Sequence, residues 1–223
     1  MKTRNKVLAG LATVAIIAVG LVVYITQFKD STKTYTWRYK MTVVVDTPEG
    51  EKSGSAVREI IAQVRPYPRD TRRPWRSLVK VKGEAVVVDL GERGMLFALI
   101  SDKADDEFYQ AFPPPAKVAP ATPEGVKYYA DLGPSLKSTI EPGPQLNPVL
   151  ATFKNIKNPK SITRVLTEED FNKYFGEGVK LKEIYLETTT EPLNWKIDTI
   201  IPEFYKTPPI WGRSILRMGA SHK

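Results

Sequence analysis

The longest apolar run in the chain stands near its N-terminus. Residues 7–28 contain no charged side chain, and three basic residues precede them. A helix over this run is long enough to cross about 30 Å of hydrocarbon, and a single segment in lipid satisfies its backbone only as a helix. The basic flank favours an N-terminus in the cytoplasm. We therefore expect a cytoplasmic flank and transmembrane anchor over 1–28, followed by a short polar stalk over 29–34.

A cleaved secretory signal is the alternative interpretation of the same segment. Its basic start, its apolar middle and the triplet Ala18-Val19-Gly20 would permit cleavage after Gly20. The apolar run continues to Ile25, however, and Tyr24 suits a membrane interface. We therefore favour a retained anchor, and N-terminal mass spectrometry distinguishes the two interpretations.

Alternation of apolar and polar residues follows the stalk. Every second residue from Trp37 to Val45 is apolar, which is the period of a half-buried strand. Residues 47–50, Thr-Pro-Glu-Gly, have the chemistry of a tight turn. A second strand is expected to return over 54–64, so that the two form an antiparallel hairpin.

Apolar runs over 83–90 and 95–100 flank a turn bracketed by two glycines. They predict a second hairpin that is buried on both faces. A short helix is expected within 102–112, where acidic residues favour the first turn. Nine prolines make 113–148 a long irregular connection, whose apolar residues predict that it wraps over the sheet.

The remaining segment alternates between strand and helix patterns. Strands are expected over 149–153, 161–165 and 179–189, and Thr167 is placed to cap a short helix. The chain as a whole predicts a mainly β, α+β fold in which antiparallel hairpins form a sandwich-like or mixed sheet with one or two short helices. We expect three parts, which are a β-hairpin lobe over 35–112, the wrapping connection over 113–148 and a second β/α lobe with a basic aromatic tail over 149–223.

Composition removes many kinds of chemistry. The chain has no cysteine and one histidine, His222, next to its C-terminal residue. Disulfides, thiolate metal sites, histidine-based triads and ordinary zinc sites therefore lack their residues. We expect no cofactor, no metal site and no catalytic residue.

The net charge of +8 is unevenly distributed. Residues 65–77 combine five arginines and two aromatic residues with one acid, and arginine forks match phosphates while aromatic rings suit a headgroup boundary. The candidate binding residues of this segment are Arg65, Tyr67, Arg69, Arg72, Arg73, Trp75 and Arg76. The basic aromatic tail adds Trp211, Arg213 and Arg217.

Four interpretations of this basic segment remain open. It is a solvated loop whose arginines pair with nearby acids, a contact for anionic lipid or another polyanion, a contact for a protein partner, or a nucleic-acid site. Nucleic acid is the weakest of these, because the chain contains no recognised nucleic-acid-binding module.

Two further groups of residues have alternative interpretations. Asp102, Asp105, Asp106 and Glu107 have the composition of a calcium or paired-carboxylate site, but a helix N-terminus accounts for them. The residues Ser53-Gly54-Ser55 stand next to Lys52 and match a serine–lysine nucleophile, although small polar residues are also expected beside a turn.

Two stretches give the chain a family resemblance. Residues 83–99 read GEAVVVDLGERGMLFAL, and residues 153–192 contain the sequences NPKSI and FGEGVKL. Together they resemble single-pass envelope proteins of Gram-negative bacteria for which no activity is assigned. The resemblance covers about a third of the chain through turns and caps, so it implies an envelope location and carries over no catalytic residue.

These observations lead to one expected function and one alternative. We expect a non-catalytic accessory or scaffold subunit in the inner membrane, with a periplasmic domain that binds a protein partner, anionic lipid or the membrane surface. The alternative is a carboxylate-based envelope hydrolase acting on glycan or another polymer. That enzyme needs two acids converging in a cleft, one of them with a raised pKa.

Overall fold

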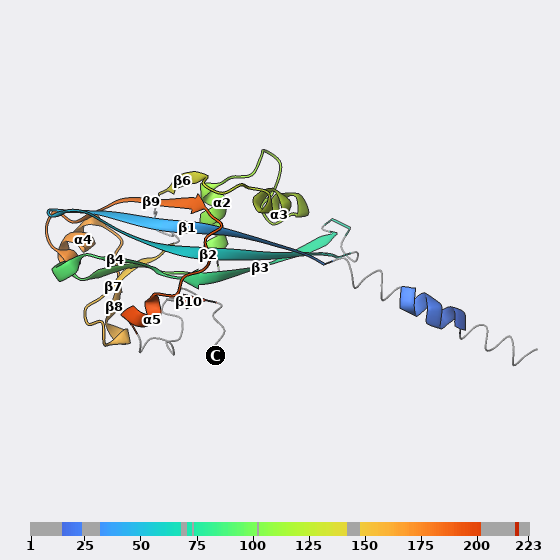
Figure 1. Ribbon diagram of the computed structural model, residues 1–223, viewed down its shortest axis with the longest axis horizontal. Coiled ribbons are helices and arrows are strands. Elements are labelled where there is room, and N and C mark those ends of the chain that lie inside the picture. Colours follow the sequence, from blue (N-terminus) through green and yellow to red (C-terminus); the bar gives the residue numbers. More distant parts are fainter. Residues whose placement is uncertain are drawn as a thin grey trace, which may run out of the picture.

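The architecture is a β-rich α+β fold built on two antiparallel sheets, as the sequence predicts (Figure 1). The computed structural model describes residues 15–23, 32–67, 71–72, 74–101, 103–141, 148–201 and 217–218. The larger sheet has the order β10-β3-β2-β1-β9-β6, and the smaller has the order β4-β5-β7-β8. Both sheets contain strands from both expected lobes.

The elements have the following bounds. The larger sheet consists of β1 (Lys33–Thr47), β2 (Gly50–Pro66), β3 (Trp75–Glu84), β6 (Lys137–Ile140), β9 (Lys180–Thr188) and β10 (Arg217–Met218). The smaller sheet consists of β4 (Val86–Asp89), β5 (Met95–Ala98), β7 (Leu150–Phe153) and β8 (Ile162–Arg164). The helices are α2 (Ala104–Ala111), α3 (Pro123–Ala130), α4 (Glu168–Phe175) and α5 (Ile197–Ile200), with short 3₁₀ turns at Gly91–Arg93 and Pro159–Ser161.

The first predicted hairpin forms, as β1 and β2. β1 and β2 pair without interruption from Lys33 opposite Val64 to Thr47 opposite Gly50. Because side chains alternate between the two faces, Tyr39, Met41 and Val43 lie on one face, where they are fully buried. This face forms the main core with α2, α3, α4 and the near face of the smaller sheet.

The second predicted hairpin also forms, as β4 and β5, which pair from Val86–Ala98 to Asp89–Met95. Its alternate residues face two different clusters: Val86 and Leu96 join the main core, and Phe97 packs with Ile197 of α5. The smaller sheet is therefore buried on both faces. Residues 83–84 belong to β3 rather than to this hairpin.

The connection 113–148 contains two elements that the sequence analysis did not predict, α3 and β6. Pro123 opens α3, where the missing N–H costs nothing, and the Thr122 hydroxyl accepts a hydrogen bond from Gly125 N at 3.1 Å. Val126 and Tyr129 are fully buried against the sheet, so this part of the connection wraps over the core as expected.

The segment after β9 crosses the outer face of the larger sheet, which is visible in Figure 1 as the orange-red ribbon that runs over β1, β2 and β3 to α5. Three contacts fix it: Thr189 N donates to Arg38 O at 3.1 Å, Lys40 pairs with Glu191 at 2.7 Å, and Val57 N donates to Asn194 Oδ1 at 3.2 Å.

Of the expected anchor, residues 15–23 are described and are helical, and the remainder lies outside the described residues. The side chains of this helix are exposed, for example Ile16 at 72% and Leu21 at 58%. Over the described part of the chain, we find no helix with both the length and the apolar character needed to cross a membrane.

Candidate interaction surface

The arginine-rich segment lies at the tip of the β2–β3 hairpin. The two strands pair as far as Pro66 opposite Trp75, and Tyr67 N donates to Pro74 O at 2.7 Å. Both prolines stand at strand ends, where the missing N–H removes no ladder bond. β2 thus extends to Pro66, further into the segment than the strand expected over 54–64.

Five of the predicted binding residues are described at this end of the hairpin, and we call Arg65, Tyr67, Arg72, Trp75 and Arg76 the tip surface. Arg76 lies over the ring of Tyr67, with 3.8 Å between the guanidinium carbon and the ring centroid. Trp75 is half-buried and packs against the main core, so its ring anchors the tip as well as facing solvent. Two further predicted residues of this segment, Arg69 and Arg73, lie outside the described residues.

Charge at the tip surface is of one sign. Arg65 and Arg76 are exposed and directly opposite each other in the β2–β3 register, where like charges are destabilising. No carboxylate of the described residues forms an ion pair with either of them. Leu78 follows on the same face and is 56% exposed. Among the described residues, this face therefore combines positive charge that no carboxylate pairs with an exposed apolar side chain.

The tail residues do not join the tip surface. In the β10–β3 register the backbone of Arg217 stands opposite Glu84, at the end of β3 away from the tip. β3 has 10 residues, which separates the two ends by about 30 Å. The other two tail candidates, Trp211 and Arg213, lie outside the described residues.

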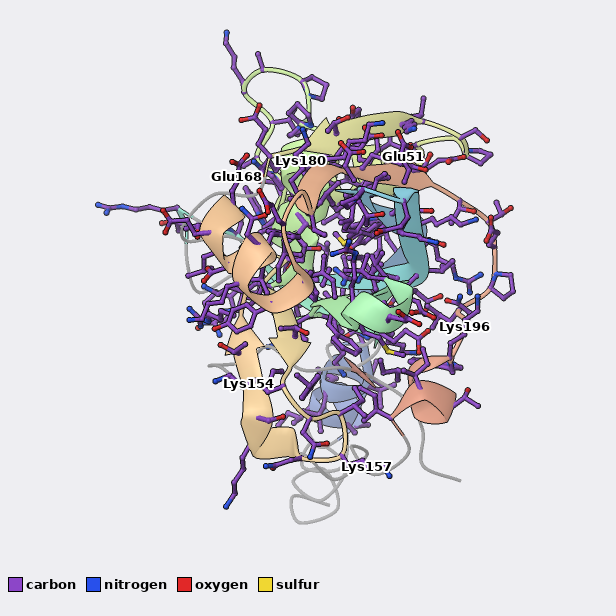
Figure 2. All side chains as sticks on the ribbon, turned by 90° about the vertical axis from the view of Figure 1, so that its left-hand side faces the viewer. Glu51, Lys154, Lys157, Glu168, Lys180 and Lys196 are labelled. Carbon is purple, nitrogen blue, oxygen red and sulfur yellow. The ribbon has the colours of Figure 1, made fainter. Side chains whose placement is uncertain are left out.

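The end of the molecule opposite the tip has mixed charge. Figure 2 looks onto this end and shows Glu51, Glu168 and Lys180 on one side, with Lys154 and Lys157 below them. Lys182 pairs with Glu51, and Arg93 pairs with Glu49 at 2.7 Å. The hydrogen bond from Arg93 lowers the pKa of Glu49 to about 2. Ion pairs therefore neutralise several charges at this end, whereas the described part of the tip shows none for Arg65 and Arg76.

A buried ion pair connects β2 to α2, and the sequence analysis missed it. Arg58 is fully buried, and its Nη1 donates to Glu107 Oε2 at 2.6 Å. The other terminal nitrogen donates to the carbonyl oxygens of Ala98 at 3.1 Å and Leu99 at 3.3 Å. Arg58 stands at an inward position of β2, opposite Tyr39. A charged side chain at an inward strand position requires a buried partner. The alternation along β2 could therefore have identified Arg58 as half of a buried ion pair from the sequence.

Burial dominates the electrostatics of Glu107. Loss of solvent raises its pKa to about 7, against the lowering effect of Arg58 and of the hydrogen bonds from Arg58 and Tyr39. Its Oε1 atom is buried without a hydrogen-bond partner in the described structure. The expectation that a helix N-terminus accounts for the acids at 105–107 is therefore incomplete for Glu107, because tertiary contacts hold its carboxylate.

Another buried acid, Glu84, fixes the start of α5. Its carboxylate accepts hydrogen bonds from the backbone N–H groups of Lys196, at 2.8 Å, and Ile197, at 3.0 Å. Among the described residues, Glu84 is the one carboxylate that lines a cavity of about 310 Å³ between β2, β4 and α5. The paired acids that the hydrolase alternative requires do not converge in this cavity, and Glu107 contributes to the core instead.

Two candidate sites remain, which are the serine–lysine pair at 52–55 and an acidic metal site. Ser53 and Ser55 line the same cavity, whereas Lys52 alternates to the opposite face of β2, so the proposed serine–lysine pair does not form. Among the residues that the structure describes, no cluster of acids and histidine has the composition of a metal site.

Comparison with known proteins gives no further information. No protein-family model, no curated protein and no solved structure matches the chain.

Proposed function

We propose that this chain is a non-catalytic accessory or scaffold subunit of the cell envelope, held in the inner membrane by residues 7–28 with its β-rich domain in the periplasm. One observation carries the proposal: Arg65 and Arg76 face each other at the tip without a described carboxylate partner, beside exposed Leu78. A partner that supplies anionic groups relieves the repulsion between the arginines and covers the apolar side chain.

The position of the tip supports a contact close to the membrane. Lys33, the first residue of β1, pairs with Val64, close to the tip, and β1 begins shortly after the expected anchor. A domain joined to the bilayer at this end holds the tip surface near the lipid headgroups. Tethering raises the local concentration, and each arginine near an anionic surface contributes about 1 kcal/mol. Weak individual contacts are then sufficient for binding.

The tip surface is tested by reversing its charge. We expect the double substitution Arg65→Glu and Arg76→Glu to lower co-purification of anionic lipid or of a protein partner at least about tenfold, because two attractive charges become repulsive. The full-length chain is isolated from membranes in a mild detergent, and bound lipids and proteins are quantified by mass spectrometry.

The matched control places the same charge change at the other end of the molecule. Lys154→Glu with Lys157→Glu alters two exposed lysines away from the tip, as Figure 2 shows, and is expected to leave co-purification unchanged. Equal co-purification by the wild type and both variants would rule out the tip as the contact surface.

The anchor is tested by fractionation. We expect the intact chain to stay in the membrane pellet after carbonate extraction, because an apolar span over 7–28 is not released by alkali. A reporter that requires the periplasm, fused after Lys223, is expected to be active. Release of the intact chain into the supernatant, or activity of a cytoplasmic reporter at the same position, contradicts the proposed topology.

A further inference from the structure

The outer edge of β3 carries no strand over most of its length. β3 pairs with β2 along one side, and on its other side β10 pairs only with Gly83 and Glu84, at the end away from the tip (Figure 1). Within the described part of the chain, residues 75–82 therefore have no strand on that side. An unpaired edge presents a row of backbone N–H and C=O groups to any chain that can add a strand.

The hydrogen bonds of the β2–β3 hairpin show which residues of β3 face this edge. Tyr67 N donates to Pro74 O at 2.7 Å at the end of the ladder. Because bonded pairs alternate in an antiparallel ladder, the residues of β3 that bond to β2 are 76, 78, 80 and 82. The backbone groups of Trp75, Ser77 and Val79 consequently point away from β2, toward the free edge. All three of these residues are half-buried.

The side chains of β3 divide between the two faces of the sheet. Those of the edge-facing residues turn toward the main core, whereas Arg76, Leu78 and Lys80 are exposed on the outer face. Neither Arg76 nor Lys80 forms an ion pair with a carboxylate of the described residues. Val81 is buried, so the accessible edge ends near Lys80. Along this edge, the exposed positions are positive, apolar and positive in turn.

This order of charges disfavours a second copy of the chain as the occupant of the edge. A symmetric pair of antiparallel β3 strands centred on Leu78 places Arg76 of each copy opposite Lys80 of the other. Like charges in directly opposite positions are destabilising, and charged edge strands are one way in which proteins prevent self-association. The same two cations favour a strand with acids at the corresponding positions.

We infer that the β3 edge over 75–80 is a docking site for an extended acidic segment of a partner protein, which adds a strand antiparallel to β3. The edge-facing backbone groups hydrogen-bond to this segment, and its outer-face side chains place acids beside Arg76 and Lys80 and an apolar residue beside Leu78. The inference rests on the proposed function, because it names a partner for the end of the molecule that carries the tip surface.

The first test measures binding of a designed peptide to the unaltered protein. The capped peptide Thr-Glu-Thr-Leu-Thr-Glu-Thr carries a neutral dye, and fluorescence polarisation follows its titration with the full-length chain in a zwitterionic detergent. A dissociation constant of about 100 µM or lower is expected. The same peptide with lysine in place of both glutamates is expected to bind at least tenfold more weakly. Failure of the acidic peptide to bind, or equal binding of the two peptides, overturns the inference.

The second test separates strand addition from simple attraction of charge. In an antiparallel pair centred on Leu78, the N–H groups of the two inner threonines point toward β3, and those of the two glutamates point away from it. N-methylation of the inner threonines is expected to weaken binding at least tenfold, whereas N-methylation of the glutamates, the matched control, is expected to preserve it. Equal binding of the two methylated peptides overturns strand addition. It leaves the charge contact of the tip surface to be decided by the co-purification test.

The third test alters the edge itself. Ser77→Pro removes one edge-facing N–H without removing a bond to β2, so at least tenfold weaker binding of the acidic peptide is expected, and Ser77→Ala is the control that keeps this N–H. The double substitution Arg76→Glu and Lys80→Glu is expected to exchange the preference, so that the lysine peptide binds more tightly than the acidic one. Unchanged affinity in a Ser77→Pro variant that is folded by circular dichroism overturns the inference. Where this variant does not fold, the methylated peptides still decide.

Other occupants of the edge give different results in the same assays. A dimer of the unaltered chain, detected by light scattering and not dissociated by excess acidic peptide, would assign the edge to a second copy. Peptide binding that appears only after residues 219–223 are removed would assign the edge to the chain's own C-terminus. Either result overturns the inference.

Discussion

Substitution of Arg58 by Met is expected to lower the free energy of unfolding by about 3–5 kcal/mol, because it leaves the Glu107 carboxylate buried without its cation. The fully buried side chain of Arg58 also satisfies the carbonyl oxygens of Ala98 and Leu99. The loss is measured by urea unfolding of the full-length chain in detergent, with tryptophan fluorescence as the signal.

Removing both charges provides the control for this prediction. The double variant Arg58→Met with Glu107→Leu is expected to be more stable than Arg58→Met alone, because no buried charge remains unpaired. If the costs of the two single substitutions simply add in the double variant, then Arg58 and Glu107 are not coupled as the 2.6 Å contact indicates.

The pH dependence gives this prediction a second readout. Burial already raises the pKa of Glu107 to about 7, and removing Arg58 takes away a lowering influence. An acid whose folded pKa exceeds its unfolded value of 4.5 favours folding at low pH, and this contribution is lost as the pH rises through the folded pKa. The stability difference between the wild type and Arg58→Met is therefore expected to be smaller at pH 5 than at pH 8. A difference that does not change with pH contradicts this account of Glu107.

The second large effect is expected at Gly54, where β2 crosses β4. A Cβ atom placed on this glycine would lie 1.9 Å from the carbonyl oxygen of Val87, and that oxygen belongs to the backbone of another strand. The overlap is relieved only if the two sheets separate. Gly54→Ala is therefore expected to lower the free energy of unfolding by about 3 kcal/mol in the same urea assay.

Gly133→Ala is the matched control for Gly54→Ala. A Cβ atom at Gly133 meets no atom within 4 Å, so this variant is expected to stay within about 0.5 kcal/mol of the wild type. Similar stability of the two variants would show that β2 and β4 are not in close contact at this position.

Both predictions concern the place where the chain passes from the larger sheet to the smaller one, which we call the sheet junction. β3 continues from the tip surface toward the centre, where the chain passes through Ala85 into β4 and the smaller sheet. Arg58 and Gly54 occupy inward positions of β2 at this junction, one bridging to α2 and the other allowing β4 to approach. The long first hairpin runs past this junction, from its turn at 47–50 at one end of the domain to the tip at the other (Figure 1).

The local elements were predictable because their signals are periodic and short in range. Alternation along 37–45, the turn at 47–50 and the Thr167 cap each involve residues close in sequence, and each prediction is confirmed. α3 was missed because its proline-rich surroundings suggested irregular structure, although Pro123 occupies the one helical turn that tolerates proline.

The tip surface was predicted in part for the same reason. The arginines and aromatic residues of 65–77 are close together along the chain, so composition alone identified them. Only the register showed that Arg65 faces Arg76 and that Arg217 lies at the far end of β3. Pairings between strands depend on residues far apart in sequence, which a local pattern does not encode.

The amino-acid sequence by itself determined the β-rich class, the approximate positions of most strands, the apolar N-terminal run and the concentration of positive charge at 65–77, because each depends on the order of neighbouring residues. Tertiary structure alone decided that Glu107 is a core residue rather than a surface acid, and that the rings of Trp37, Phe108 and Tyr129 pack on one another. These side chains come from different elements, and burial and partners exist only once those elements pack together.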